Sequence, residues 1–192
     1  LKVAAILKGH TVAENVSLSI APGSKQVLNM LALNGALSDM INAGARILES
    51  ACGPCIGMGQ SPNSKGISLR TFNRNFEGRS GTADAGIYLV SPETAAVSAI
   101  AGVLTDPREN GEPLHILMPD KFIVNDNMIE MPASEEDADK VEVIYGPNIK
   151  PFPKTEKLPE SIEAKALLKV GDDITTDHIM PAGAKILSYR SN

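Results

Sequence analysis

Aromatic residues, basic charge and long apolar runs are all scarce in this chain of 192 residues. It contains no tryptophan, and aromatic side chains make up only 4% of the residues, too few for a surface that stacks on nucleic-acid bases. The net charge of −5 also argues against a nucleic-acid partner, because nucleic-acid-binding proteins are usually basic. No apolar run approaches the roughly 18 residues of a membrane span. We therefore expect neither nucleic acid nor a membrane as a partner.

Cysteine is scarce as well. The two cysteines, Cys52 and Cys55, form a single Cys-x-x-Cys unit, whereas a secreted disulfide scaffold needs more cysteines spread along the chain. The first residues have neither the length nor the cleavage pattern of a signal peptide. We therefore predict a reducing, cytoplasmic location. The chain begins at Leu1 without an initiating methionine, so we expect it to be part of a longer protein.

Strands that alternate with helices predict an α/β fold with a mainly parallel sheet. Ser24 and Ser91 stand where N-caps are expected, and Pro92 suits the first position of the helix that follows. The predicted strands cover residues 16–20, 45–48, 67–71 and 87–90, and the predicted helices cover 25–33, 36–42 and a segment that starts at 92.

The composition changes after residue 110. Residues 111–160 are rich in proline and carry an acidic cluster between Glu135 and Asp139, which is typical of a stiff linker without continuous helix. Two strand-like pieces, 115–118 and 141–145, predict that this linker packs on other parts of the protein. We therefore divide the chain into an α/β domain (1–110), a linker (111–160) and the incomplete start of a second domain (161–192).

Cys52-Gly53-Pro54-Cys55 supports three interpretations. A thioredoxin-like redox pair would need a helix after the second cysteine, but the glycines and proline between residues 57 and 66 make a helix of any length improbable there. Two thiolates at this spacing can instead bind one metal or iron–sulfur cluster. A pair of buried, inert thiols is the third interpretation.

Arginines gather shortly after the cysteines. Arg70, Arg74 and Arg79 are interspersed with Asn73, and Glu77 is the single acidic residue among them. Arginine is favoured where a planar carboxylate or phosphate is bound through two parallel hydrogen bonds. The pattern therefore predicts a site for a carboxylate-rich ligand close to the cysteines.

Residues 51–57 read Ala-Cys-Gly-Pro-Cys-Ile-Gly, and residues 73–79 read Asn-Arg-Asn-Phe-Glu-Gly-Arg. Together they resemble the signature of the aconitase superfamily, which includes aconitase, homoaconitase and isopropylmalate isomerase. The match continues at 81–82, 90–93 and 105–107. Residues 171–179, Gly-Asp-Asp-Ile-Thr-Thr-Asp-His-Ile, look like the opening of the family's mobile swivel domain. The resemblance leads us to expect a three-layer α/β sandwich followed by a linker and this second domain.

The resemblance also implies a [4Fe–4S] cluster held by three cysteines, with one iron that acts as a Lewis acid on a substrate hydroxyl. It assigns two of the thiolate ligands to Cys52 and Cys55. Asn73, Arg74, Arg79 and Arg190 would bind the substrate, and Asp177 would be an active-site acid. We expect His178, beside Asp177, to be structural.

The third cluster cysteine and the family's serine base are missing from the sequence. We therefore expect this chain alone neither to hold an intact cluster nor to turn over substrate, and to need the rest of the polypeptide as its partner. A linker that joins the swivel domain to the cluster domain in one chain favours aconitase or homoaconitase. The residues Thr175-Thr176-Asp177-His178 lean toward aconitase, which isomerises the tricarboxylates citrate and isocitrate through cis-aconitate. Homoaconitase and 3-isopropylmalate dehydratase are the alternatives within the family. Relatives that lose their cluster can bind RNA, but the charge and the low aromatic content argue against this for the present chain.

Overall fold

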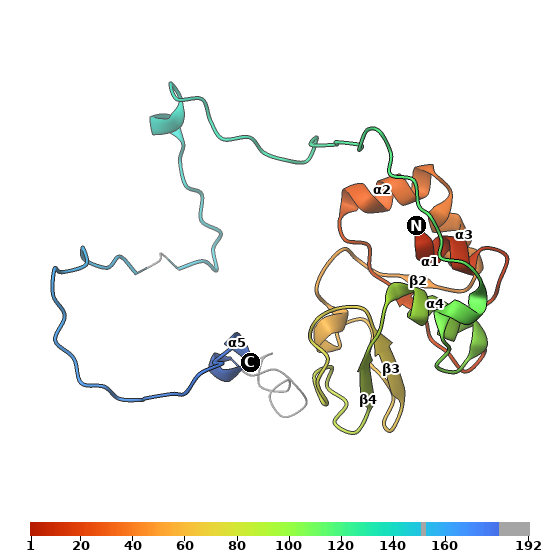
Figure 1. Cartoon of the computed structure of the whole chain (residues 1–192). Helices are drawn as coiled ribbons and strands as arrows, with labels where there is room; N and C mark the ends of the chain where they lie inside the picture. Colours follow the sequence, from red (N-terminus) through yellow and green to blue (C-terminus); the bar gives the residue numbers. More distant parts are fainter. Residues whose placement is uncertain (151–152, 181–192) are drawn as a thin grey trace. The chain divides into compact units, whose positions relative to one another are not determined.

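The computed structural model describes residues 1–150 and 153–180 (Figure 1). The chain forms two units. The first comprises Leu1–Val124 together with the chain from Thr175 onward, and the second comprises Asn125–Ile174. Every residue of the candidate site described below belongs to the first unit.

Three helices build the first part of this unit: α1 (Lys2–Leu7), α2 (Lys25–Leu33) and α3 (Ala36–Asn42). The predicted N-cap of α2 is confirmed, since the Ser24 hydroxyl accepts a hydrogen bond from the Val27 amide at 3.1 Å. Such a cap satisfies one of the amides that a helix N-terminus leaves unpaired. The sequence did not predict α1, whose N-cap residue is Leu1 and which has no side-chain cap.

The strands form two parallel pairs. Strand β1 (Ser19–Ile20) pairs with β2 (Arg46–Ile47), with Ser19 opposite Arg46. Strand β3 (Ile67–Arg70) pairs with β4 (Gly86–Leu89), with Arg70 opposite Leu89 (Figure 1). Helices combined with parallel strands confirm the α/β class. Strands β1, β2 and β3 are shorter than predicted, β4 has the predicted length but starts one residue earlier, and the described residues form two separate two-stranded sheets.

Helix α4 (Pro92–Ala101) starts at the predicted place, with the Ser91 hydroxyl accepting from the Thr94 amide at 3.0 Å. It packs against α1, which also packs against α3 (Figure 1). Small side chains such as Ala96 and Ala99 allow the close approach of α4, and burying apolar surface between these helices stabilises the unit. The buried residues of the two core clusters are Ala4, Ile6, Leu7, Leu31, Ala36, Met40, Ala43, Ala45, Ala96 and Val97.

The predicted strands at 115–118 and 141–145 are wrong. Neither segment pairs with another strand in the described part of the chain, and their side chains are exposed, with Leu117 at 91% and Ile144 at 89%. An unpaired strand leaves its backbone groups to water, and Pro113 and Pro119 flank the first segment. The only helical turns between residues 102 and 174 are the 3-10 helices η2 (Pro107–Asn110) and η3 (Ala138–Lys140), leaving aside 151–152. The proposed boundaries at 110 and 160 stay predictions.

The last described element is α5 (Thr176–Ile179), a single helical turn. Among residues 1–150 and 153–180, no helix has the length and apolar character needed to cross a membrane.

Candidate functional site

The cysteines lie on a tight loop, residues 52–60, which we call the cysteine loop. A short 3-10 helix, η1 (Pro54–Ile56), carries Cys55 and ends at Gly57, which has a left-handed backbone with φ of 85°. Cys52 is exposed, whereas Cys55 is buried, and both are free thiols. We predicted that no long helix follows Cys55, and this is confirmed, because the next element after η1 is strand β3. A thioredoxin-like pair needs such a helix, so its main structural support is removed.

The Cys55 thiol affects the ionisation of Cys52. A hydrogen bond with Cys55, followed by charge repulsion from it, raises the pKa of Cys52 above the usual value of a cysteine. Repulsion between two thiolates is relieved when both bind the same cation, because the metal supplies the compensating charge. The pair is therefore suited to bind one metal centre.

Gly57 lets the cysteine loop lie directly on the chain that follows Arg79. A Cβ atom at Gly57 would lie 2.1 Å from the Ser80 carbonyl oxygen, closer than any side chain tolerates. Nearby, the Ser61 hydroxyl donates to the same carbonyl oxygen at 2.9 Å. The cysteine loop and the arginine segment, which we define as residues 70–81, therefore fix each other's position.

A second set of contacts ties the cysteine loop to the first sheet. The Arg46 guanidinium on β2 donates to the Gln60 side-chain oxygen at 2.9 Å and to the Gly59 carbonyl at 2.8 Å. The Ser19 hydroxyl on β1 donates to the same Gln60 oxygen at 3.0 Å. Arg46 and Gln60 could not be predicted as part of this region from the sequence, because nothing in their local pattern distinguishes them from ordinary polar surface residues.

Arg79 joins the cysteine loop to the swivel-like motif. Its side chain donates from Nε to the Cys55 carbonyl at 3.3 Å and from Nη2 to Cys55 Sγ at 3.4 Å, while Nη1 donates to Asp177 Oδ1 at 2.7 Å. Burial opposes the charged form of Arg79, but Cys55 and then Asp177 outweigh it and raise the pKa of the guanidinium. One rigid side chain thus connects a predicted cluster ligand with the predicted active-site acid.

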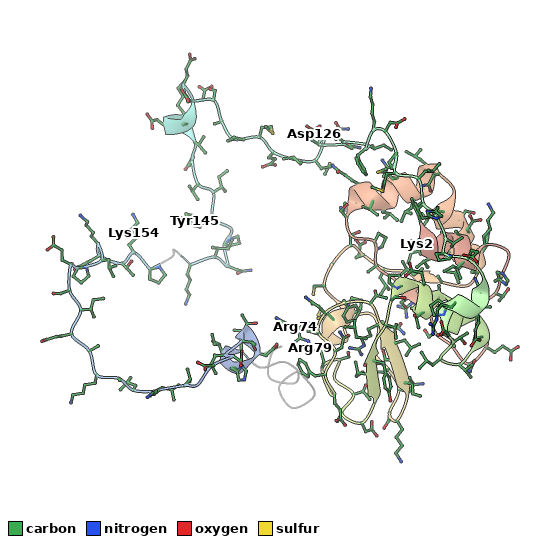
Figure 2. The ribbon with its side chains drawn as sticks, in the orientation of Figure 1. Lys2, Arg74, Arg79, Asp126, Tyr145 and Lys154 are labelled. Atoms are coloured by element: carbon green, nitrogen blue, oxygen red, sulfur yellow. The ribbon has the colours of Figure 1, made fainter. Side chains whose placement is uncertain are left out.

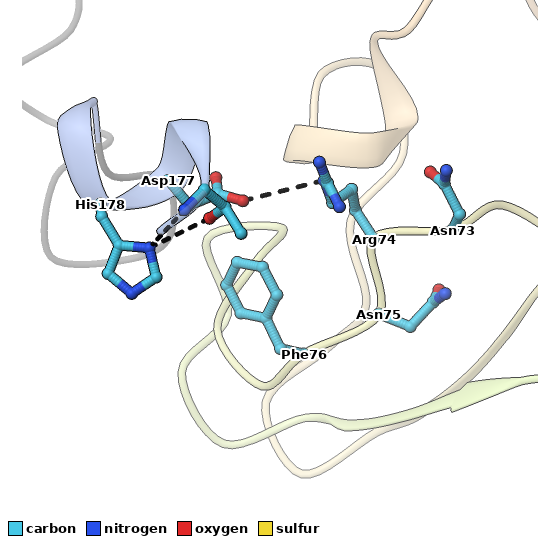
Figure 3. Close-up of a pocket in the computed structure, with 7 residues that line it drawn as sticks. Asn73, Arg74, Asn75, Phe76, Asp177 and His178 are labelled. Atoms are coloured by element: carbon cyan, nitrogen blue, oxygen red, sulfur yellow. Dashed lines mark hydrogen bonds and ion pairs between the residues drawn. The ribbon is translucent and has the colours of Figure 1, made fainter. Parts of the chain in front are cut away.

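Arg74 approaches the same carboxylate from more open surroundings (Figure 3). Its Nε lies 3.8 Å from Asp177 Oδ2, and its side chain is 44% exposed. A pocket of about 380 Å³ lies between these groups. It is lined by Asn73, Arg74, Asn75, Phe76, Thr175, Asp177 and His178 (Figure 3).

The structure therefore brings Asn73, Arg74 and Asp177 together around one pocket, with Arg79 bonded to Asp177. His178 accepts a hydrogen bond on Nδ1 from the Thr175 amide at 3.0 Å and so caps α5 (Figure 3). Arg190, the remaining predicted substrate residue, lies outside the described residues.

Four buried side-chain atoms of the described residues have no hydrogen-bond partner. They are Ser50 Oγ, Arg70 Nη1, Asn75 Oδ1 and Ser80 Oγ. All four belong to the stretch that also carries both cysteines and the pocket arginines, whereas buried polar atoms are normally paired. Arg70 was predicted as one of the clustered arginines, but its burial was not.

These observations fit part of an iron–sulfur site. Two neighbouring thiols can supply two of the ligands of such a cluster, and the guanidinium that donates to one sulfur is a group that orients a metal-binding thiolate. Residues 1–150 and 153–180 contain no group of three or more metal-binding side chains, so the fit is to two of the ligands.

Known proteins have sequences similar to this one. Residues 1–102 match the family model described as Aconitase family (aconitate hydratase). The mitochondrial homoaconitase of Debaryomyces hansenii is 37% identical over 186 residues, which cover 94% of this chain and 25% of the relative. The homoaconitase large subunit of Thermus thermophilus is 47% identical over 107 residues, covering 55% of this chain and 26% of the relative.

The 3-isopropylmalate dehydratase large subunit 2 of Archaeoglobus fulgidus is 44% identical over 111 residues, covering 57% of this chain and 27% of the relative. The chain thus spans about a quarter of the length of these curated relatives. Since the family model matches more than half of its residues, the chain belongs to the aconitase family.

Proposed function

We propose that this chain is part of a [4Fe–4S]-dependent hydro-lyase, which moves a hydroxyl group along a tricarboxylate by removing and re-adding water. The observation that carries the proposal is the contact network of Arg79, which reaches both Cys55 and Asp177. Such a network connects a metal-binding thiol, a carboxylate-binding guanidinium and an acid, and this reaction needs all three.

Cys52 and Cys55 supply two thiolate ligands, and the third comes from the rest of the polypeptide. When bound, the cluster offers an open iron that polarises the substrate hydroxyl. Arg79 stabilises the negative charge of the cysteine loop by donating to Cys55 Sγ, an interaction that also orients the ligand.

Arg74, Arg79 and Asn73 bind the carboxylates of the substrate. The Asp177 carboxylate already holds Arg79 Nη1 at 2.7 Å, so a substrate carboxylate of the same geometry can take this position or share it. Each charge-assisted hydrogen bond of this kind contributes about 1.5–3 kcal/mol. Asp177, placed beside the pocket and bonded to Arg79, acts as an active-site acid, whereas the base is the serine that this sequence lacks.

Citrate and isocitrate, interconverted through cis-aconitate, are our first proposal for the substrates. The mitochondrial homoaconitase matches 94% of this chain, whereas the two large subunits match 55% and 57%. This difference supports a protein in which residues 1–110, the linker 111–160 and the swivel domain beginning at 161 form one polypeptide. The same match favours homoaconitase activity as the second candidate.

The test uses the complete protein, reconstituted with iron and sulfide. Ultraviolet absorbance follows formation of the unsaturated intermediate from citrate, isocitrate, homoisocitrate and 3-isopropylmalate. We expect the highest kcat/KM with isocitrate. A higher value with homoisocitrate would select the second candidate, and no dehydration of any of the four would refute the hydro-lyase proposal.

A matched pair of variants tests the carboxylate site. Arg74→Met removes a guanidinium that lines the pocket, so we expect KM to rise by roughly tenfold or more, the loss of at least one charged hydrogen bond. Arg108→Met removes an exposed guanidinium on η2 that does not line this pocket, and its KM should match that of the unaltered protein.

The location of the complete protein is a separate proposal. The small number of cysteines favours the cytoplasm, whereas the Debaryomyces hansenii relative is named as mitochondrial. Cell fractionation with an antibody against this chain distinguishes the two compartments.

A further inference from the structure

His178 lines the pocket, but the proposed function gives it no task. It shares the pocket with Arg74 and Asp177, and its Nδ1 is bonded to the chain that enters α5 (Figure 3). The Thr175 amide nitrogen lies 3.0 Å from this ring nitrogen, and the Thr175 hydroxyl lies 3.2 Å from it. The side chain of a pocket residue thus supports the backbone from which the pocket is built.

The contact with the amide determines the protonation state of the ring. A backbone amide can only donate a hydrogen bond, so His178 Nδ1 is the acceptor and carries no proton. The neutral imidazole then has its single proton on Nε2. A second proton, on Nδ1, would set two N–H groups against each other and remove the contact.

This contact closes a turn that has little other support. Helix α5 is a single turn, and so short a helix is not stabilised by its backbone hydrogen bonds alone. The His178 amide donates to the Thr175 carbonyl at 3.0 Å, and the His178 ring accepts from the Thr175 amide in return. A side chain three residues into a helix that bonds back to the N-cap amide is the arrangement of a capping box.

Asp177 lies inside the closed turn, between the two residues that close it. Its Oδ1 accepts from Arg79 Nη1 at 2.7 Å, and its Oδ2 lies 3.8 Å from Arg74 Nε. The arginine segment is held by its contact with the cysteine loop, whereas Asp177 reaches the arginines from a turn of four residues. The direction of the Asp177 carboxylate therefore depends on whether this turn is closed.

We propose that His178 is a positioning residue for Asp177. The neutral imidazole accepts from the Thr175 amide, closes the turn of α5 and so keeps the Asp177 carboxylate against Arg74 and Arg79. The effect on turnover rests on the proposed function, in which Asp177 is the active-site acid. The closing contact itself needs neither cluster nor substrate, and His178 acts through Asp177 rather than on the substrate.

The proposal predicts a dependence on pH. Histidines gain their second proton at roughly pH 6–7, and Nδ1 then has no lone pair to accept with. The charged groups around this pocket are Arg74 and Asp177, with Arg79 bonded to Asp177. The arginines stay protonated, but Asp177 can also titrate, so the test needs a variant that removes the titration of His178 alone.

Two substitutions provide this separation. His178→Gln keeps an acceptor at a position where capping boxes favour glutamine, and the amide oxygen accepts at any pH. His178→Leu has a side chain without an acceptor. His115→Leu is the matched control, because His115 is exposed and does not line the pocket.

Hydrogen exchange measures the turn directly in the complete protein, through the peptide that contains residues 175–180. Exchange in His178→Leu should be about 2- to 30-fold faster, as expected for the loss of a capping contact, and His178→Gln and His115→Leu should match the unaltered protein. After correction for the intrinsic effect of pH on exchange, acidification should open the turn in the unaltered protein and not in His178→Gln.

Steady-state kinetics of the reconstituted complete protein measures the consequence for turnover. His178→Leu should lower kcat by up to about 30-fold, and His178→Gln should restore it and lose less activity on acidification than the unaltered protein. In an Asp177→Asn background, His178→Leu should have no further effect, because the carboxylate that the turn positions is already gone.

The outcomes separate this inference from the proposed function. If the complete protein dehydrates none of the four substrates, the proposed function is refuted, and the exchange measurement still decides whether His178 closes the turn. Equal exchange in His178→Leu and the unaltered protein would refute the closing contact. Losses of kcat that add fully to those of Asp177→Asn would refute the positioning of Asp177. A raised KM in both His178 variants with unchanged exchange would assign the ring to the substrate instead.

Discussion

Two glycines of the cysteine loop offer a controlled test of how that loop is held. Gly57 and Gly59 both have left-handed backbones, with φ of 85° and 81°. They differ in their surroundings, because a Cβ at Gly57 would lie 2.1 Å from the Ser80 carbonyl oxygen, whereas a Cβ at Gly59 would meet nothing within 4 Å. Replacing each by alanine therefore separates backbone strain from the close approach to Ser80.

The magnitudes follow from these two terms. An alanine in the left-handed region costs roughly 1–2 kcal/mol, and this cost is common to both variants. The Cβ at Gly57 also collides with backbone atoms that cannot rotate away, and overpacking of this kind costs about 1–3 kcal/mol more. The destabilisation of the loop by Gly57→Ala should thus exceed that by Gly59→Ala by about 1–3 kcal/mol. The strain should weaken the contact between Cys55 and Arg79.

Alkylation of Cys55 under native conditions measures this local stability, because the thiol is buried and reacts only when the loop opens. Peptide mass mapping distinguishes it from the exposed Cys52. In the complete protein without added iron, Gly57→Ala should react about 5- to 150-fold faster than Gly59→Ala. Equal rates in the two variants would show that Ser80 does not limit the loop.

Three further predictions concern contacts around the core and the site. The Lys2 ammonium on α1 lies 2.7 Å from Glu93 of α4 and lowers the pKa of that carboxyl (Figure 2). This ion pair contributes up to about 1 kcal/mol to the free energy of unfolding. The contribution is present above the ordinary pKa of glutamate and is lost as the pH falls through the lowered pKa of Glu93. Unfolding curves of Lys2→Met and the unaltered protein should differ at pH 7 and converge once the pH falls below the lowered pKa of Glu93. Arg46→Met removes the two hydrogen bonds from the first sheet to Gln60 and to the Gly59 carbonyl at the end of the cysteine loop. Alkylation of the buried Cys55 thiol should then be up to about tenfold faster. An unchanged rate would mean that the loop does not depend on the first sheet. Asp177→Asn should lower kcat by on the order of 10²- to 10⁴-fold, as expected for a residue that transfers a proton, and an unchanged kcat in steady-state kinetics would remove Asp177 from that role.

Local signals in the sequence predicted the elements well where the chemistry is itself local. Ser24 and Ser91 cap their helices as expected, because a hydroxyl needs only an amide three residues ahead. Helix α1 (Lys2–Leu7) was missed because it has no capping side chain and gains its stability by packing on α3 and α4. The wrong strands at 115–118 and 141–145 have strand-like side chains but no partner in the described residues.

The candidate site was predictable in its residue types but not in its connections. The spacing of the cysteines and arginines selected residues that the structure brings together, since Arg79 contacts both Cys55 and Asp177; their chemical roles stay predictions. The contact between Arg79 and Asp177 joins residues far apart in the sequence and depends on how α5 meets the arginine segment. The burial of Arg70 likewise depends on long-range packing, which a short window of sequence does not encode.

The donors of Arg79 suggest why an arginine stands at this position. Nε and Nη2 hold Cys55, and Nη1 holds Asp177, so a planar group with fixed directions contacts both partners at once. A lysine could satisfy one partner but not both in this geometry. Because the contacts share one rigid group, a ligand that displaces Asp177 from Nη1 also alters the charge balance at Cys55. The two sites are thus coupled. If a carboxylate bound at Arg79 changes the affinity of the cysteine loop for a metal by some factor, metal binding must change the affinity of Arg79 for the carboxylate by the same factor.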